Sequence, residues 1–167
     1  SYINPSRGLV LEVDLEYAPD LFDVNSSFFR QAFIIRYYTE IFLKNLILAS
    51  RAMEQVVISG SQSSQFLAIP VGGSNTLRGV PLDRYRFKSS IIINNELRFP
   101  IWWRFGGIAG VDIGYGSNKD LYPDGTIDWV VNPVVGLRFF MDNFIVRADV
   151  GFYKDDIGFY LNFGHIY

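Results

Sequence analysis

The sequence predicts an all-β chain whose strands form a transmembrane, antiparallel, up-and-down β-barrel. Apolar and polar residues alternate with period two along much of the chain, as expected of strands that have one apolar face. Aromatic residues make up 17% of the sequence and charged residues only 19%, against roughly 25% charged residues in a typical soluble domain. We find no mostly apolar stretch of about 18 residues that could cross a bilayer as a helix.

Four strands are expected in the first part of the chain. In the first of them, apolar residues at odd positions alternate with Glu12, Asp14 and Glu16. The third is the least regular, because Glu54 interrupts its apolar face. The four predicted segments are Leu9–Tyr17, Phe29–Glu40, Leu46–Ser59 and Ile91–Ile101.

Four more strands are expected in the second part of the chain. Each again has an apolar face opposite glycines and charged residues. Pro133 is discordant, because proline cannot donate to a strand ladder, and it predicts a bulge or an interruption. The four segments are Ala109–Tyr115, Ile127–Phe139, Phe144–Phe152 and Phe159–Tyr167.

The position of the aromatic residues favours a membrane barrel over a soluble lipocalin-like barrel or sandwich, which has the same alternation. Aromatic residues gather at strand ends, as at Tyr37–Tyr38, Trp102–Trp103 and Phe139–Phe140. Membrane barrels place aromatic girdles at the two interfaces and turn their charges into the lumen. We therefore expect Glu96 and Asp112, which oppose the apolar faces of their strands, to face a lumen.

Connection lengths also alternate along the chain. Short periplasmic turns and long extracellular loops are typical of bacterial outer-membrane barrels, so we expect the connection Gly60–Lys88 on the extracellular side and Tyr167 on the periplasmic side. The short joins are Leu43–Lys44, Trp102–Arg104 and Asp142–Asn143, and the long ones are Ala18–Ser26, Gly60–Lys88 and Gly116–Thr126. The Lys154–Ile157 hairpin is an exception, since it is short but falls on the long-loop side.

Several function classes lack support in the sequence. A net charge of −2 gives no electrostatic reason to bind nucleic acid. The one histidine, His165, can form neither a catalytic triad nor a metal cluster. We expect no enzyme activity, metal or cofactor, and a single barrel domain over residues 1–167 without periplasmic modules.

The long connection contains a motif, Gly72-Gly73-Ser74-Asn75-Thr76-Leu77-Arg78-Gly79-Val80. It resembles the loop motif of the BamA, TamA and FhaC superfamily, although Val80 stands where that family has an aromatic residue. Glu96, in an Asn-Glu-Leu-Arg-Phe-Pro stretch, and Asp112, in Gly-Val-Asp-Ile-Gly ending at Gly114, are similar to the acids on the two following strands. The resemblance implies that Arg78, beside Gly79, reaches into the lumen and pairs with both acids.

The last predicted strand also resembles the closing strand of that superfamily. Its matching positions are Phe159, Leu161, Phe163, Gly164 and Tyr167. The resemblance implies that this strand is the assembly signal by which the barrel assembly machinery binds the chain. The eight strands correspond to the C-terminal eight of a sixteen-stranded barrel.

The resemblance implies insertion or translocation of proteins at the bacterial outer membrane, through bilayer thinning and a weak seam between first and last strands. The alternative is a passive structural barrel or membrane anchor. Expected partners are the lipid bilayer with its lipopolysaccharide and the assembly machinery. Since an eight-stranded barrel is filled by its own side chains, three arrangements stay open: half of a longer barrel, a homodimer that completes a larger barrel, or a closed miniature barrel.

Overall fold

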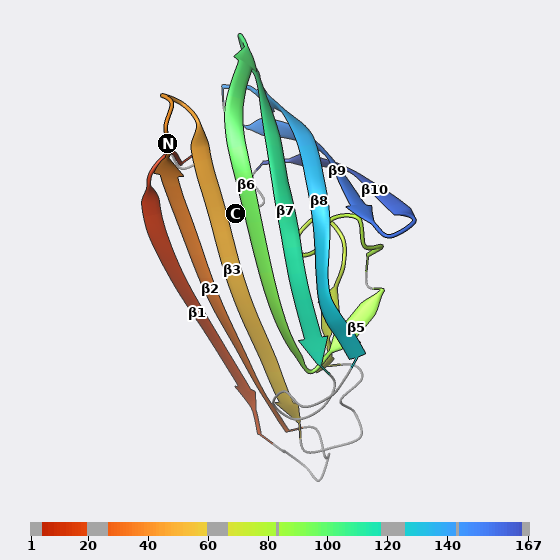
Figure 1. Cartoon of the computed structure of the whole chain (residues 1–167). Helices are drawn as coiled ribbons and strands as arrows, with labels where there is room; N and C mark the ends of the chain where they lie inside the picture. The colour runs from red at the N-terminus through yellow and green to blue at the C-terminus, as the bar shows by residue number, and fades with distance from the viewer. Residues whose placement is uncertain are drawn as a thin grey trace.

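The computed structural model describes residues 5–19, 27–59, 67–82, 84–117, 126–142 and 144–164. Its fold is all-β, and eight strands form one antiparallel sheet in the order β1-β2-β3-β6-β7-β8-β9-β10 (Figure 1). Two further strands, β4 and β5, form a separate hairpin. The bounds are β1 Gly8–Ala18, β2 Phe28–Glu40, β3 Ile47–Ser59, β4 Ile69–Val71, β5 Tyr85–Phe87, β6 Ser89–Trp102, β7 Phe105–Ser117, β8 Thr126–Phe140, β9 Ile145–Tyr153 and β10 Asp156–Phe163.

The eight sheet strands coincide with the eight predicted segments, with ends that differ by a few residues. β7 begins at Phe105, ahead of the predicted Ala109, and β10 begins at Asp156, ahead of the predicted Phe159. His165 and Tyr167 lie outside the described residues. The hairpin of β4 and β5 was not predicted, because three-residue strands are too short for alternation to reveal them.

The sheet is open, and the closed eight-stranded barrel that the sequence left possible is wrong. In the described residues β1 pairs only with β2, and β10 pairs only with β9. A closed barrel of eight strands has room inside for little more than its own side chains. Here the chain between β3 and β6 lies against one side of the sheet, so closure on eight strands would have to expel it (Figure 1).

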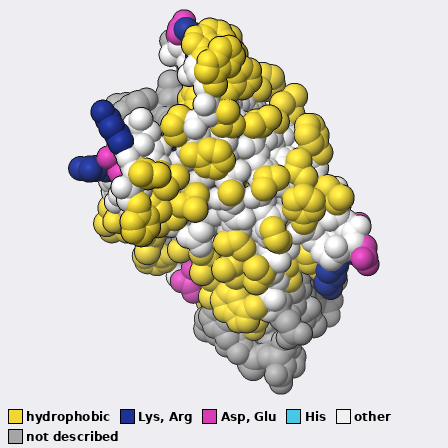
Figure 2. All heavy atoms as spheres, turned by 45° about the horizontal axis from the view of Figure 1, so that its top comes forward, with side chains coloured by type: hydrophobic (Ala, Val, Ile, Leu, Met, Phe, Trp, Pro, Cys, Tyr) yellow, Lys and Arg dark blue, Asp and Glu magenta, His cyan; other side chains and the backbone are white. Residues whose placement is uncertain are grey.

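The two faces of the sheet differ in chemistry. We call the face that the chain between β3 and β6 covers the inner face, and the opposite one the outer face. Large apolar side chains of the outer face are exposed, from Leu9, Leu11 and Leu15 on β1 to Phe159 and Leu161 on β10. Figure 2 shows hydrophobic side chains over most of the visible surface, with charged groups near its borders. This distribution is the reverse of a soluble sandwich, which buries its apolar faces.

An apolar cluster joins the inner face to the hairpin region. Leu77 and Val80 of the connection pack with Met53 of β3 and Ile92 of β6. Val80, which stands where the resembled superfamily has an aromatic residue, has a fully buried side chain. The cluster consists of Met53, Val57, Ile69, Val71, Leu77, Val80, Phe87, Ile92 and Tyr153.

The short turns after β2, β6 and β8 lie at one end of the sheet, as the sequence predicts, and the short turn between β9 and β10 lies at the other end (Figure 1). The short-turn end contains the turns after β2, β6 and β8, with Phe42, Asn45 and Trp103 at positive φ. Aromatic residues gather at both ends of the sheet. Trp103 and Phe139 lie at the short-turn end with ring centroids 6.1 Å apart, and Tyr115 and Trp129 lie toward the other with centroids 5.4 Å apart.

Pro133 interrupts strand pairing on one side only. It pairs with Val111 of β7, whereas the ladder between β8 and β9 begins one residue later, at Val134. Because proline has no N–H to donate, the ladder to β9 stops where the proline begins. Within the described residues, no helix is long and apolar enough to span a membrane.

Candidate functional site: an arginine held by acids on the inner face

The connection between β3 and β6 brings Arg78 to the middle of the inner face through a compact loop. The loop, Gly72–Val80, is closed by a hydrogen bond from the Gly73 N–H to the Val80 carbonyl, 2.9 Å long. The Thr76 hydroxyl bonds both the N–H and the carbonyl of Gly72, each at 2.8 Å. These bonds satisfy the backbone locally and leave Arg78 at the tip.

Arg78 is fully buried and holds two carboxylates. Its Nε and Nη2 donate to the two oxygens of Asp112 on β7, at 2.8 and 2.7 Å. Its Nη1 donates to Oε1 of Glu96 on β6 at 2.6 Å. The structure therefore brings together the three charged residues that the sequence singled out, with the planar two-pronged geometry in which a guanidinium binds a carboxylate best.

A third acid, Asp149 of β9, completes the cluster. Its Oδ2 lies 3.5 Å from Arg78 Nη1 and 2.9 Å from Arg147 Nη2, and its Oδ1 accepts a bond from Arg138. Nothing in the sequence linked Asp149 to Arg78. The resemblance covers acids only on the two strands that follow the loop. Because β9 lies much further along the chain, the motif gave no reason to pair one of its residues with Arg78.

Two asparagines on the inner face fix the loop backbone. Asn94 Nδ2 donates to the Thr76 carbonyl at 2.8 Å and to Asp112 Oδ1 at 2.7 Å. Asn132 Nδ2 donates to the Arg78 carbonyl at 3.0 Å. Sequence reasoning missed both, since an asparagine opposite an apolar face is also an ordinary lumen residue. They extend the contacts of the loop to three successive strands, β6, β7 and β8.

The glycines predicted at the site make room for the loop. Gly79 has φ +97°, which favours glycine. A Cβ at Gly114 would overlap the Leu77 side chain. Gly151 of β9, which was not predicted, lies against the backbone of Arg78 and Gly79. The loop tip thus packs directly on strand backbone.

The residues proposed as an assembly signal lie apart from the cluster, on the free edge of the sheet. Phe159, Leu161 and Phe163 of β10 are exposed on the outer face. Gly164 follows the strand with φ +91° and donates its N–H to the Ile145 carbonyl at 2.7 Å. Tyr167 lies outside the described residues.

The cluster suits mechanical attachment better than bond-making chemistry. Three acids surround a guanidinium, so the centre that a metal ion would need is already occupied by Arg78. Removing one partner of a buried pair typically costs about 3–5 kcal/mol, because a charge is left uncompensated. The arrangement therefore fastens the loop to the inner face. No protein-family model matches this chain, and no curated protein matches it in sequence.

Proposed function

We propose that this chain forms part of the wall of an outer-membrane β-barrel that inserts or translocates other proteins, in the manner of the BamA, TamA and FhaC superfamily that its motifs resemble. The observation that carries the proposal is the buried contact of Arg78 with Glu96 and Asp112 on a sheet whose opposite face is apolar and exposed. In a soluble protein the apolar face would be buried and the charged face would be exposed to water. A barrel in lipid instead has an apolar exterior and a polar lumen.

The lengths of the strands support a membrane position. Strands β2, β3, β6, β7 and β8 have 13 to 15 residues, and about 9–11 tilted residues cross the apolar part of a bilayer. Strands β9 and β10 have only 9 and 8 residues. Shorter strands present a narrower apolar band to the lipid at the β9–β10 edge of the sheet. A narrow band favours local thinning of the bilayer, which would ease insertion of an incoming strand.

The open edges require further strands. In lipid, each unpaired backbone group costs several kcal/mol, so β1 and β10 need partners. A barrel wider than eight strands has space for the loop that already covers the inner face. The additional strands would come from another part of the same protein or from a second copy.

The membrane position can be tested with the three tryptophans of the sequence, Trp102, Trp103 and Trp129. Their exposed fractions are 73%, 72% and 57%, and they lie toward opposite ends of the sheet. After reconstitution, lipids brominated near the headgroup should quench their fluorescence more strongly than lipids brominated near the chain ends. Fluorescence that neither lipid quenches would refute membrane insertion.

The activity itself requires a second assay. Liposomes that contain the chain should fold an added, urea-unfolded outer-membrane barrel protein faster than empty liposomes do. Arg78→Ala should remove the acceleration while the control Arg84→Ala, in the same connection but exposed, retains it. Quenched tryptophans without any acceleration would instead identify a passive barrel or anchor.

A further inference from the structure

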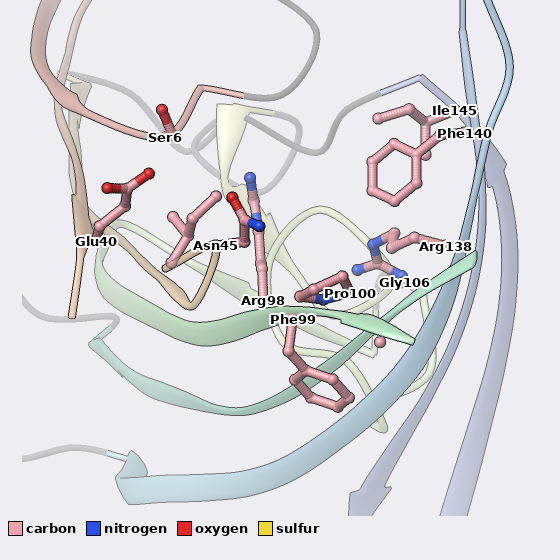
Figure 3. Close-up of a pocket in the computed structure, with 12 residues that line it drawn as sticks. Ser6, Glu40, Asn45, Arg98, Phe99, Pro100, Gly106, Arg138, Phe140 and Ile145 are labelled. Carbon is pink, nitrogen blue, oxygen red and sulfur yellow. The ribbon is translucent and has the colours of Figure 1, made fainter. Parts of the chain in front are cut away.

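A pocket of about 370 Å³ opens on the inner face at the short-turn end of the sheet. It lies beyond the Arg78 cluster, on the side away from the loop. In Figure 3, Arg98 and Arg138 point into it from two different sides, Phe140 and Ile145 lie on the same side as Arg138, and Asn45 lies on the opposite side. Gly106 of β7, which pairs with both Pro100 and Arg138, lets the Phe140 ring lie close to the strand backbone, since a Cβ at this position would come within 2.8 Å of that ring.

The two arginines converge on one carboxylate. Arg98 Nε lies 3.1 Å from one oxygen of Glu96, and Arg138 Nη2 lies 3.7 Å from the other. Arg138 is only 5% exposed, yet its Nη2 forms no hydrogen bond with the residues that the structure describes. Glu40, the one acidic residue lining the pocket, already binds Arg7 at 3.1 Å. In the pocket lining Glu40 is thus the one acid, and beneath it Glu96 and Asp149 lie against the arginines, so an anion in the pocket would share Arg98 and Arg138 with these two carboxylates.

Buried charge on the inner face has a positive surplus. The described residues include five buried arginines, Arg51, Arg78, Arg98, Arg138 and Arg147, and three buried acids, Glu96, Asp112 and Asp149. Among these buried side chains the arginines outnumber the acids by two. Burying an uncompensated charge is costly, so a ligand with negative charge would be stabilised where the donor is open, at Arg138.

We propose that this pocket binds an organic phosphate monoester, with the phosphate between Arg98 and Arg138 and the organic group against Phe140 and Ile145. Guanidinium groups bind phosphate oxygens with directed hydrogen bonds. A phosphate monoester carries about −1.5 to −2 charges at pH 7, which matches the surplus. The apolar side of the pocket selects an esterified phosphate over inorganic phosphate. The proposal does not depend on the insertion activity.

Isothermal titration calorimetry of the whole chain, folded in an uncharged detergent, tests the proposal. Phenyl phosphate should bind saturably with one site per chain, inorganic phosphate more weakly, and benzyl alcohol not at all. Dihexanoyl phosphatidic acid distinguishes a lipid headgroup from a soluble metabolite as the source of the phosphate. If it binds more tightly than phenyl phosphate, the pocket is assigned to a lipid headgroup. If it binds equally or more weakly, the pocket is assigned to a soluble metabolite. Equal affinity for phenylacetate, or no saturable binding of either phosphate ester, would overturn the proposal.

Two variants locate the site. Arg138→Gln should weaken binding of phenyl phosphate about tenfold or more, because it removes a charged donor. Asn45→Asp places a negative charge at the pocket without disturbing the arginine cluster, and Asp tolerates the positive φ of this position; it should also weaken binding. Arg104→Gln, which removes an exposed cation paired with Asp142 at the same end of the sheet, should leave the affinity unchanged. Unchanged affinity in Asn45→Asp would refute the location, even where Arg138→Gln fails to fold.

Discussion

Arg78 and Gly151 lie backbone against backbone, with no space for a side chain between them. A Cβ at Gly151 would overlap the carbonyl group of Arg78, and a Cβ at Gly79 would come within 2.9 Å of the carbonyl carbon of Gly151. The same loop tip is bonded to β10, since the Gly79 N–H donates to the Tyr160 hydroxyl at 3.0 Å. The loop is therefore attached to five successive strands, from Glu96 on β6 to Tyr160 on β10.

Gly151→Ala should destabilise the folded sheet by displacing the loop. The added methyl group has no free volume, and overpacking of this kind typically costs about 1–3 kcal/mol. The free energy of unfolding can be measured by urea titration in detergent, with heat-modified gel mobility as a second measure. Ala148→Ser, on the outer face of the same strand, is the control. Equal stability of the two variants would show that the loop is not packed on Gly151.

Arg78→Ala should have the largest effect of any single arginine substitution. It leaves Asp112 and Glu96 buried, and Asp112 then retains only the Asn94 amide and the backbone N–H of residue 78, with no cation bonded to it. We expect a loss of about 3–5 kcal/mol in the free energy of unfolding. Arg84→Ala, which removes an exposed pair with Asp156, should change it by only about 0–1 kcal/mol.

The melting temperature by heat-modified gel mobility distinguishes the two arginines. A similar melting temperature for both variants would mean that the buried pairs do not hold the loop. Adding Asp112→Asn to Arg78→Ala should recover part of the loss, because it removes the uncompensated charge. Failure of this rescue would point to lost packing instead.

Much of this architecture could be predicted from local sequence, and the rest depends on contacts between distant residues. Alternation identified the eight sheet strands, because the side-chain period of a strand is a local property. The acids Glu96 and Asp112 follow the loop within two strands, so their pairing with Arg78 was accessible to a motif. Gly151 and Tyr160 were not, since they are more than 70 residues from the loop tip.

Openness of the sheet could not be predicted from alternation. Leu9–Tyr17 shows the same period whether its free edge is paired or not. What decides closure is the volume on the inner face, where the buried chain around Leu77 and Val80 takes the space that a small barrel lacks. That volume is a property of the whole assembly of strands and of no single segment.

Tyr160→Phe tests how firmly the loop is attached to the last strand. The Tyr160 hydroxyl accepts from the Gly79 N–H and donates to the Val80 carbonyl at 3.2 Å. Without it, both backbone groups lose a partner, so we expect a loss of about 1–3 kcal/mol in local stability. Amide hydrogen exchange at Gly79 should become faster, whereas Tyr37→Phe, on the outer face of β2, should leave it unchanged. Equal exchange in both variants would contradict attachment through the hydroxyl.

The two free edges lead to a last prediction, about the association of the 167-residue chain on its own. The eight strands alternate in direction, so β1 and β10 are antiparallel to each other. Two copies can therefore join β1 of one to β10 of the other around a common axis, which pairs both edges and widens the lumen. Since unpaired backbone groups are costly in lipid, we expect the chain in detergent to be dimeric by analytical ultracentrifugation.

Single cysteines can identify which edges meet in that dimer. Leu11→Cys lies on the outer face of β1 and Leu161→Cys on the outer face of β10. A flexible bis-maleimide should link the two variants when they are folded together as a mixture, and should link neither variant to itself. Ile113→Cys on β7, away from both edges, should not react with either. A chain with both cysteines provides the opposite outcome. If β1 and β10 are crosslinked within one monomeric chain, the chain forms a closed eight-stranded barrel, and the loop must have left the inner face.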